Sequence, residues 1–311
     1  MQKILVIGGA TATGKTNLAA RWAEEFNGEL ISADSRQVYR GMDLGTGKDK
    51  PEGVKIWGYD LVNPDEDFSV ADFVKFSWSV IEELWRKSKL PIVVGGTGLY
   101  LKSWWQPPAS LGVKPNQELR SKLDHLNTKQ LQAELKQVAP ERFRQMNWSD
   151  QNNPRRLLRA IEVAGYHLQG VHTATSEVKN PRGVRKTADV AWVGLTAERQ
   201  VLEDRIKQRV EKRVKEGMTA EVKRLMREYA DWTLPAFSAT GYREWRDYVK
   251  NKTSEEEAVD RWQRAEIQYM RRQLTWFKKM PQFTWFDIGE KSWENQVKQW
   301  ICRKLKFPTE R

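Results

Sequence analysis

The sequence predicts an α/β fold in which a parallel sheet is flanked by helices and an all-helical subdomain is inserted. In the first third of the chain, short apolar runs that end near glycine alternate with stretches of helical periodicity. This alternation is typical of a parallel sheet with helices on both faces. From about residue 104 to 183 the strand patterns give way to polar helical ones. We therefore expect core segments at residues 1–112 and 185–311, with a helical insertion at 113–184 between them.

The expected strands are short and buried, and they lie at residues 3–7, 30–33, 91–96 and 189–195. The first helix repeats Leu18, Trp22 and Phe26 at helical spacing, and the second carries an apolar stripe from Val70 to Trp85 behind Ser69 as N-cap. After the last expected strand, the whole chain is predicted to be helical, over residues 197–229, 238–250 and 254–279.

Composition narrows the class of protein. The chain has 311 residues, with 53 Lys and Arg against 41 Asp and Glu, which gives a net charge of +12. No apolar run approaches the roughly 18–20 residues of a membrane span, and no signal-peptide cleavage site follows the N-terminus. Cys302 is the only cysteine, so it forms neither an internal disulfide nor a zinc site alone. We expect a cytoplasmic protein whose basic surface binds nucleic acid, an anionic metabolite or a membrane surface.

Tryptophan is unusually frequent, with 15 residues in the chain. Packing in the core is the favoured explanation, and stacking of nucleic-acid bases is the alternative.

The strongest motif fits G-x-x-x-x-G-K-[ST] and lies between an expected strand and an expected helix, as a P-loop requires. It comprises Gly9, Ala10, Thr11, Ala12, Thr13, Gly14, Lys15 and Thr16. In such a loop the backbone N–H groups and the helix N-terminus bind phosphate oxygens, the lysine adds charge and the threonine hydroxyl binds Mg²⁺. The expected fold is therefore P-loop NTPase-like, with Mg²⁺ as cofactor and Thr16 as its ligand.

Polar residues follow two further strands, at the sheet edge where open α/β sheets bind ligands. Asp34 could bind Mg²⁺ or act as a general base, with a helix N-cap as the alternative. Thr97, within Gly-Gly-Thr-Gly, offers a hydroxyl to the same crevice, although a tight turn explains this segment equally well.

Three arginines, Arg205, Arg209 and Arg213, follow one another at intervals of four and therefore share one helix face. Such a row can clamp a pyrophosphate or follow a nucleic-acid backbone. The alternative is a solvated face on which Glu203 and Glu211 compensate the charge.

Several motifs in order resemble those of one known family. They are the P-loop, ISADSRQVYRGMDLGTGK (31–48), DFSVADF (67–73), LPIVVGGTGLYLK (90–102), NPRRLLRAIEV (153–163), TGYRE (240–244) and RRQLTWF (271–277). Together they span nearly the whole chain, and they resemble the tRNA dimethylallyltransferases, also called tRNA isopentenyltransferases, of the bacterial type.

The resemblance implies transfer of a dimethylallyl group from dimethylallyl diphosphate to N6 of the adenosine 3′ of a tRNA anticodon, with release of pyrophosphate. It implies that Asp34 accepts the N6 proton and that Thr97 contacts the reacting region. The P-loop would then hold the diphosphate, and Lys15 with Arg205 or Arg209 would neutralise the leaving group.

The implied partners are dimethylallyl diphosphate and the anticodon stem-loop, whose adenine must be extruded to react. We expect a monomer without a membrane partner. The residues expected to contact tRNA are Asp34, Ser35, Arg36, Gln37, Arg120, Arg155, Arg156, Leu157, Leu158, Arg159, Ser238, Thr240, Gly241, Tyr242 and Arg243.

The chain departs from the family pattern at four places. Ala10 replaces the usual proline, Trp57-Gly58 stands about where a His-His pair is usual, Glu266-Ile267 replaces Thr-Arg, and Arg213 replaces methionine. The positions implied in catalysis are unchanged, and Glu266-Ile267 bears on the tRNA or diphosphate contacts of the last long helix.

Three other functions would account for part of these residues. An adenylate isopentenyltransferase acting on free AMP, ADP or ATP would not need a basic surface for RNA. A P-loop small-molecule kinase would need a strand ending in a Walker-B-like aspartate, whereas the third strand ends in Gly-Gly. A non-catalytic RNA-binding module would leave Lys15, Thr16 and Asp34 unexplained.

Overall fold

The computed structural model describes residues 2–168 and 188–307 and divides into two compact units. The first unit contains the described residues up to Gln106 and those from residue 188 onward, and the second contains the described residues from Pro107. The division falls at Gln106, where we predicted residue 112. The predicted boundary at 184 lies outside the described residues.

The first unit is built on a six-stranded sheet in the order β3-β2-β4-β1-β5-β6. Every neighbouring pair is parallel, and Ile7 of β1 lies opposite both Val94 of β4 and Val193 of β5. The strands are β1 (Lys3–Gly9), β2 (Gly28–Ser32), β3 (Ile56–Trp57), β4 (Leu90–Gly95), β5 (Asp189–Thr196) and β6 (Thr284–Asp287). The predicted parallel sheet is confirmed.

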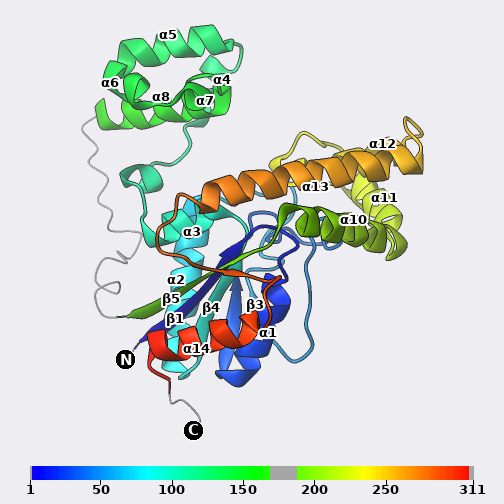
Figure 1. Cartoon of the computed structure of the whole chain (residues 1–311). Coiled ribbons are helices and arrows are strands. Elements are labelled where there is room, and N and C mark those ends of the chain that lie inside the picture. Colours follow the sequence, from blue (N-terminus) through cyan, green and yellow to red (C-terminus); the bar gives the residue numbers. More distant parts are fainter. Residues whose placement is uncertain (1, 169–187, 308–311) are drawn as a thin grey trace. The chain divides into compact units, whose positions relative to one another are not determined.

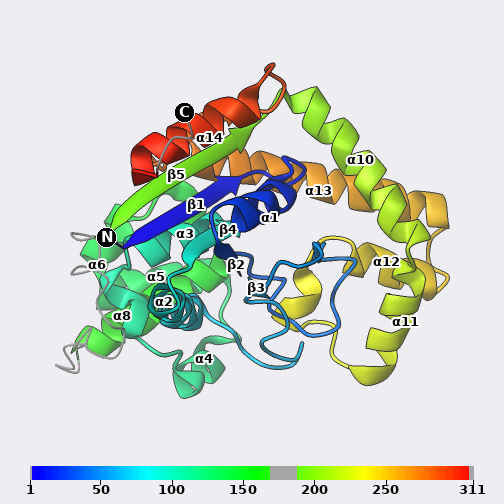
Figure 2. The same cartoon turned by 90° about the horizontal axis from the view of Figure 1, so that it is seen from below.

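Helices cover both faces of this sheet, and its inner strands β1, β2, β4 and β5 are therefore largely buried. The helices are α1 (Lys15–Glu25), α2 (Val70–Arg86), α3 (Gly98–Trp105), α10 (Arg199–Lys215), α11 (Met218–Glu228), α12 (Tyr242–Val249), α13 (Glu255–Phe277) and α14 (Trp293–Leu305). Figure 2 shows α1 beside β1 and α14 along β5, where Leu18 and Ile301 pack in one core with Val193. The adjacent Trp192 points to the opposite face and meets Trp104 of α3 at 5.9 Å between ring centroids.

Seven of the 15 tryptophans are buried and six more are half-buried, as packing in the core predicts. Trp104 also stacks on Trp78 at 5.1 Å, and Trp245 and Trp262 are fully buried in a second core. Two large exceptions are Trp148, which is 79% exposed, and Trp285, which is 36% exposed.

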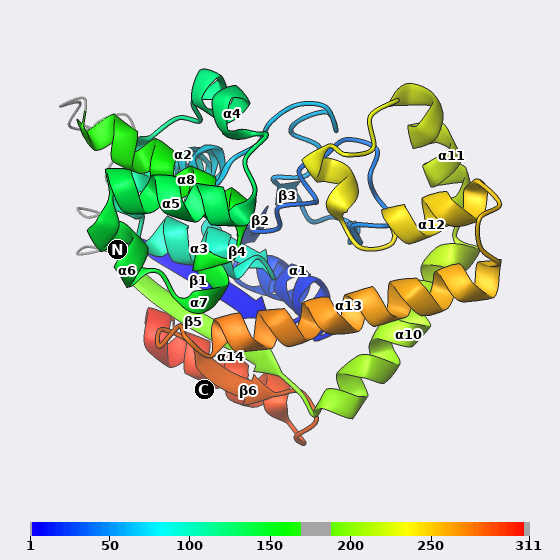
Figure 3. The ribbon, with the colours of Figure 1, turned by 90° about the horizontal axis from the view of Figure 1, so that it is seen from above.

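The helices α10 to α13 form a layer beside the carboxyl ends of the strands (Figures 1 and 3). Their shared core also takes in Tyr39 and Met42 from the long segment after β2. The predicted helix over 197–229 is wrong at its centre, because Gly217 adopts a left-handed φ of 111° and separates α10 from α11. The expectation of helix alone after residue 195 is also wrong, since β6 follows α13.

The second unit is helical throughout its described residues, as predicted. It contains α4 (Gln117–Leu123), α5 (Thr128–Val138), α6 (Pro140–Gln145), α7 (Trp148–Gln151) and α8 (Pro154–Leu168), after a short 3-10 turn at Ala109–Gly112. Leu131, Leu135 and Ile161 form its core. Asparagine side chains cap three of the helices, because Asn116 accepts from the Leu119 N–H, Asn127 from the Gln130 N–H and Asn147 from the Asp150 N–H.

Candidate active site

A cavity of about 310 Å³ lies at the carboxyl ends of β1, β2 and β4 in the first unit. The P-loop, the turn after β2, the turn after β4, α10 and α13 all contribute to its lining. Parallel sheets bind their ligands at this edge, so the cavity stands where the sequence places a site. Of the residues predicted to act here, the following line it: Thr11, Ala12, Gly14, Lys15, Thr16, Asp34, Ser35, Arg36, Gln37, Arg209, Ser238 and Thr240.

The P-loop is held in a phosphate-binding conformation by its glycines. Gly9 passes so close to β5 that a Cβ there would lie 2.4 Å from the Leu195 carbonyl oxygen. Gly14 has a φ of 79° at the N-cap of α1, a conformation that favours glycine. Lys15 folds back so that its Nζ donates to the Ala10 carbonyl oxygen at 2.6 Å. Burial and the nearby Arg209 lower the pKa of Lys15 to about 7, so this cation is short of counter-charge.

Gln273 of α13 joins the P-loop to the turn after β4. Its Oε1 accepts from the Thr11 N–H at 2.8 Å and its Nε2 donates to the Gly96 carbonyl oxygen at 3.0 Å. Gly96 and Gly98 are needed for this approach, since Cβ atoms there would lie 2.3 Å from Gln273 Nε2 and 1.9 Å from Trp276. Gln273 was not predicted as a site residue, and its only signal is its place in the RRQLTWF motif.

Asp34 lies directly after β2 with its carboxylate in the cavity lining. Its Oδ1 accepts from the Arg36 N–H at 2.8 Å in a non-helical turn, so the helix N-cap alternative is wrong. Burial raises the pKa of Asp34, although the backbone hydrogen bond, Arg36 and Lys15 oppose the shift. A carboxylate with a raised pKa is a stronger proton acceptor than an ordinary aspartate.

Thr97 holds this turn from the other side. Its Oγ1 accepts from the Ser35 N–H at 3.1 Å, and its hydroxyl lies beside that of Tyr269 on α13. Burial and the nearby Asp34 raise the pKa of Tyr269, so its hydroxyl stays neutral in the cavity wall. Tyr269 was not predicted as a site residue, although it lies only two residues before the RRQLTWF motif.

The arginine row of α10 faces the P-loop. Arg209 Nη1 donates to Thr11 Oγ1 at 3.1 Å, and the exposed Arg205 reaches the Ala12 carbonyl oxygen at 3.4 Å. Glu203 pairs with Arg199 at 2.7 Å and with Arg271 at 3.0 Å, away from the row. The solvated-face alternative is therefore wrong for Arg209 and for Arg213, which is buried.

Two segments predicted to contact tRNA lie together. Arg36 donates through Nη1 to the Pro235 carbonyl oxygen at 2.7 Å and through Nη2 to Ser238 Oγ at 2.8 Å. Gln37 donates to the Gly47 carbonyl oxygen at 3.0 Å, and Arg243 is exposed at the start of α12. Tyr242 needs a correction, because its side chain is fully buried and its hydroxyl donates to Glu221 Oε1 at 2.7 Å.

The predicted residues of the second unit fall into two groups. Arg155 and Arg156 are exposed on α8, and Arg156 pairs with Asp150. Arg120 and Arg159 instead hold the buried carboxylate of Glu162, through contacts of 2.6 Å and 3.0 Å. Leu157 is fully buried in the core of the unit, with Leu158 packed against the same core. The expectation of a side-chain contact to tRNA is therefore wrong for Leu157, where helix periodicity was overlooked.

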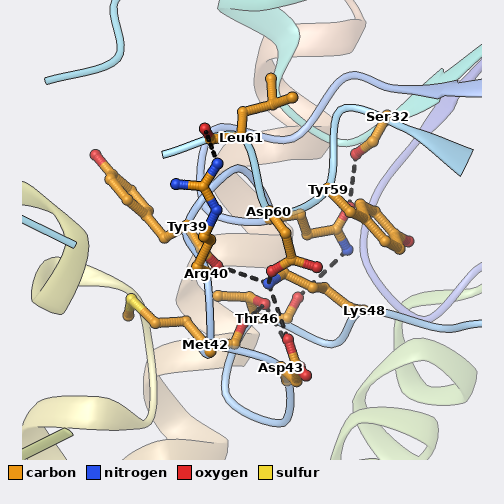
Figure 4. A network of polar contacts seen from close by, with 12 residues as sticks. Ser32, Tyr39, Arg40, Met42, Asp43, Thr46, Lys48, Tyr59, Asp60 and Leu61 are labelled. Atoms are coloured by element: carbon orange, nitrogen blue, oxygen red, sulfur yellow. Dashed lines mark hydrogen bonds and ion pairs between the residues drawn. The ribbon is translucent and has the colours of Figure 1, made fainter. Parts of the chain in front are cut away.

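A buried lysine braces the long segment that follows β2 (Figure 4). Lys48 Nζ donates to the Tyr39 carbonyl oxygen at 2.6 Å and pairs with Asp43 at 2.8 Å and with Asp60 at 2.5 Å. The pKa of Asp43 is lowered overall, because the hydrogen bond and the charge of Lys48 outweigh the opposing effect of burial. Lys48 thereby fixes the loop of Gly45 and Gly47 in the cavity wall, a role that the sequence did not reveal.

Metal ligands are sparse in the described part of the chain, where no cluster of three His, Cys, Asp or Glu side chains occurs. This donor set does not suit a dedicated metal cage. It does suit Mg²⁺ carried by phosphate oxygens, which needs only one or two protein ligands. Thr16 lines the cavity beside Lys15 and is placed for that part.

The fold and this cavity define a P-loop α/β protein that combines cations for a phosphate-bearing ligand with a buried carboxylate. Within residues 2–168 and 188–307, no helix has the length and apolarity needed to cross a membrane.

Comparison with known proteins specifies the family. The sequence profile described as IPP transferase matches residues 37–280. A tRNA dimethylallyltransferase of Thermoanaerobacter sp. is 35% identical, with 98% of this chain and 99% of that protein covered, and one of Acetivibrio thermocellus is 38% identical, with 95% and 96% covered. The crystal structure of a tRNA isopentenylpyrophosphate transferase from Bacillus halodurans has a TM-score of 0.71 at 33% identity, over 98% of this chain and 97% of that one. The chain belongs to the IPP transferase family.

Proposed function

We propose that this chain transfers the dimethylallyl group of dimethylallyl diphosphate to N6 of the adenosine that follows the anticodon of a tRNA. One observation carries the proposal: a buried carboxylate and a phosphate-binding loop with its cations line the same cavity. The pKa values of Asp34 and Lys15 show the charge of each acting on the other. The names of the relatives, which are tRNA dimethylallyltransferases, support the acceptor and the donor.

In the proposed reaction, a bond forms between adenine N6 and the allylic carbon while the bond from that carbon to the diphosphate oxygen breaks. The exocyclic amine is a weak nucleophile, so Asp34 accepts its proton as the attack proceeds. The departing electron pair stays on the diphosphate. Lys15, Arg209 and the P-loop N–H groups stabilise that charge, with Arg205 at the rim of the loop.

The two substrates approach different parts of the cavity wall. The diphosphate occupies the P-loop, where Thr16 would hold Mg²⁺, and Mg²⁺ would supply further charge neutralisation at the leaving oxygens. The adenine must leave its stack to reach Asp34, and Arg36, Gln37 and Ser238 line its approach. Thr97 and Tyr269 fix the turn that carries Asp34.

Two further parts of the proposal concern the whole molecule. The enzyme is proposed to work as a monomer. It is proposed to work in the cytoplasm, together with its tRNA, and the exposed Arg155 and Arg243 are proposed to contact the RNA backbone.

An acceptor assay tests the proposal. The purified protein is incubated with labelled dimethylallyl diphosphate and Mg²⁺, and receives unmodified tRNA, AMP or no acceptor. The proposal expects label in tRNA alone. Label in AMP instead of tRNA would make the chain an adenylate isopentenyltransferase, and absence of transfer to both would contradict the reaction class.

A further inference from the structure

Arg213 differs from the other two arginines of its row. Its side chain is 6% exposed, and it reaches the cavity wall from α10. Nη1 is 3.4 Å from the Gly45 carbonyl oxygen and 3.6 Å from Glu266 Oε1. Nη2 is also buried, and it has no hydrogen-bond partner among the described residues. A guanidinium donor in this state costs free energy unless a ligand satisfies it.

The local charge favours an anionic ligand. Arg209 and Arg213 converge on Gly47, where a Cβ would lie 2.2 Å from Nη2 of the first and 1.8 Å from Nη2 of the second. Glu266 is the buried carboxylate beside them, and it also accepts from the Thr240 hydroxyl at 2.8 Å. Burial and Arg209 lower the pKa of Arg213 to about 10, so the guanidinium is still charged at neutral pH. Asp49 is a second carboxylate near Arg213. The cavity lining nevertheless carries more cations than carboxylates, with Lys15, Arg36, Arg209, Arg213 and Arg272 against Asp34, Asp49 and Glu266, which leaves a net positive charge.

A purely structural pair does not account for this arrangement. An arginine kept only to balance Glu266 would direct its free N–H groups to backbone or side-chain acceptors. Here Arg213 lines the same cavity as the P-loop, next to Arg209, which contacts that loop directly.

We propose that Arg213 is an additional phosphate-binding cation of the donor site, whose Nη2 donates to an oxygen of the diphosphate while Glu266 holds the guanidinium in place. The inference rests on the proposed function for the identity of the diphosphate. Arg213 is thereby a binding residue, and Glu266 is a positioning residue that acts through it.

Direct binding of inorganic pyrophosphate tests the role of Arg213 without turnover. Isothermal titration in the presence of Mg²⁺ compares the wild type with Arg213→Met, and with Lys212→Met as the matched control on the exposed side of α10. Loss of one charge-assisted hydrogen bond predicts a Kd about 10- to 100-fold higher for Arg213→Met. Lys212→Met is expected to bind within about twofold of the wild type.

Two further variants separate binding from folding and positioning. Arg213→Met combined with Glu266→Gln removes both charges, so no buried carboxylate is left unpaired, and the same loss of pyrophosphate affinity is expected. Glu266→Gln alone is expected to weaken pyrophosphate binding by less than Arg213→Met. Arg213→Lys is expected to recover part of the affinity, because it restores charge without the guanidinium geometry.

Steady-state kinetics and tRNA-binding measurements distinguish the proposed role of Arg213 from its alternatives. Arg213→Met is expected to raise KM for dimethylallyl diphosphate and to leave the tRNA Kd unchanged. Unchanged pyrophosphate affinity would overturn the inference. A weakened tRNA complex alone would assign Nη2 to an RNA phosphate, and a lowered KM for the donor would place the side chain against the hydrocarbon tail. If the wild type binds pyrophosphate through Arg213 but modifies no tRNA, the inference stands and the proposed function fails.

Discussion

Replacement of Asp34 by asparagine separates the proposed catalytic role of this residue from its structural role. The Oδ1 atom of Asp34 accepts the Arg36 N–H at 2.8 Å, and an asparagine oxygen can accept the same bond. The substitution keeps the shape of the side chain and removes a buried charge whose pKa is already raised by burial. We therefore expect Asp34→Asn to fold with at least the stability of the wild type.

The expected loss is catalytic. An asparagine amide does not accept a proton from adenine N6, and general-base catalysis contributes about 10²- to 10⁴-fold to a rate. This range corresponds to about 3–5 kcal/mol in the activation free energy. The measurement is single-turnover transfer from labelled dimethylallyl diphosphate to tRNA, with the tRNA Kd and the pyrophosphate Kd determined in parallel.

Both Kd values are expected to stay within about threefold of the wild type, because Asp34 is assigned to proton transfer. The exposed Asp204→Asn serves as the matched control, since it makes the same chemical change outside the cavity. A transfer rate for Asp34→Asn within about fivefold of the wild type would refute the role of general base. Loss of tRNA binding with little change in the transfer step would make Asp34 a structural residue.

The pH dependence of activity and three substitutions test other parts of the molecule. The pH profile of kcat/KM should rise through the raised pKa of Asp34 and fall above about 7 as Lys15 loses its proton. Lys15→Arg should remove the decrease at high pH. A decrease that persists in this variant would have to come from another group. Gln273→Leu leaves the Thr11 N–H and the Gly96 carbonyl unsatisfied, so urea denaturation should show a loss of about 2–5 kcal/mol, against little change for the exposed Gln268→Leu. Lys48→Met removes the partner of Asp43 and Asp60 and should lower the free energy of unfolding. The loss should be only about 1–3 kcal/mol, because both carboxylates are partly exposed and water reaches them. An unchanged midpoint of urea denaturation would contradict the bracing role. Arg155→Ala should reduce the salt dependence of tRNA binding by about one unit of slope in a plot of log K against log salt, and an unchanged slope would remove Arg155 from the interface.

Local signals predicted the catalytic edge of the sheet well. The P-loop and its strand and helix occupy consecutive residues, so spacing alone located Lys15 and Thr16. Asp34 could be placed in the cavity because the carboxyl ends of parallel strands share one edge.

The parts that were missed depend on long-range packing or on weak patterns. Gln273 reaches Thr11 across 262 residues of sequence, and no local pattern reports such a contact. The strand β6 has only four residues at the edge of the sheet, too few for a clear alternation. Spacing placed Arg205 and Arg213 on one helix face, but it did not show that Arg213 is buried beside Glu266.

Burial also divides residues that the family motifs group together. In TGYRE, Tyr242 belongs to a core while Arg243 is exposed, and in NPRRLLRAIEV, Leu157 is buried while Arg155 is exposed. A sequence motif indicates that a group of residues is characteristic of a family, whereas helix periodicity decides which of these residues face a ligand. The tRNA contacts are therefore proposed for the exposed members of each motif.

The central claim is that one cavity joins the allylic diphosphate to an adenine of tRNA. The most direct test is nucleoside mass spectrometry of unmodified tRNA after incubation with dimethylallyl diphosphate, with the modified position mapped by nuclease digestion. The account predicts N6-(dimethylallyl)adenosine at the adenosine 3′ of the anticodon and one pyrophosphate released for each group transferred. Unmodified tRNA, or pyrophosphate release without any prenylated adenosine, would contradict it.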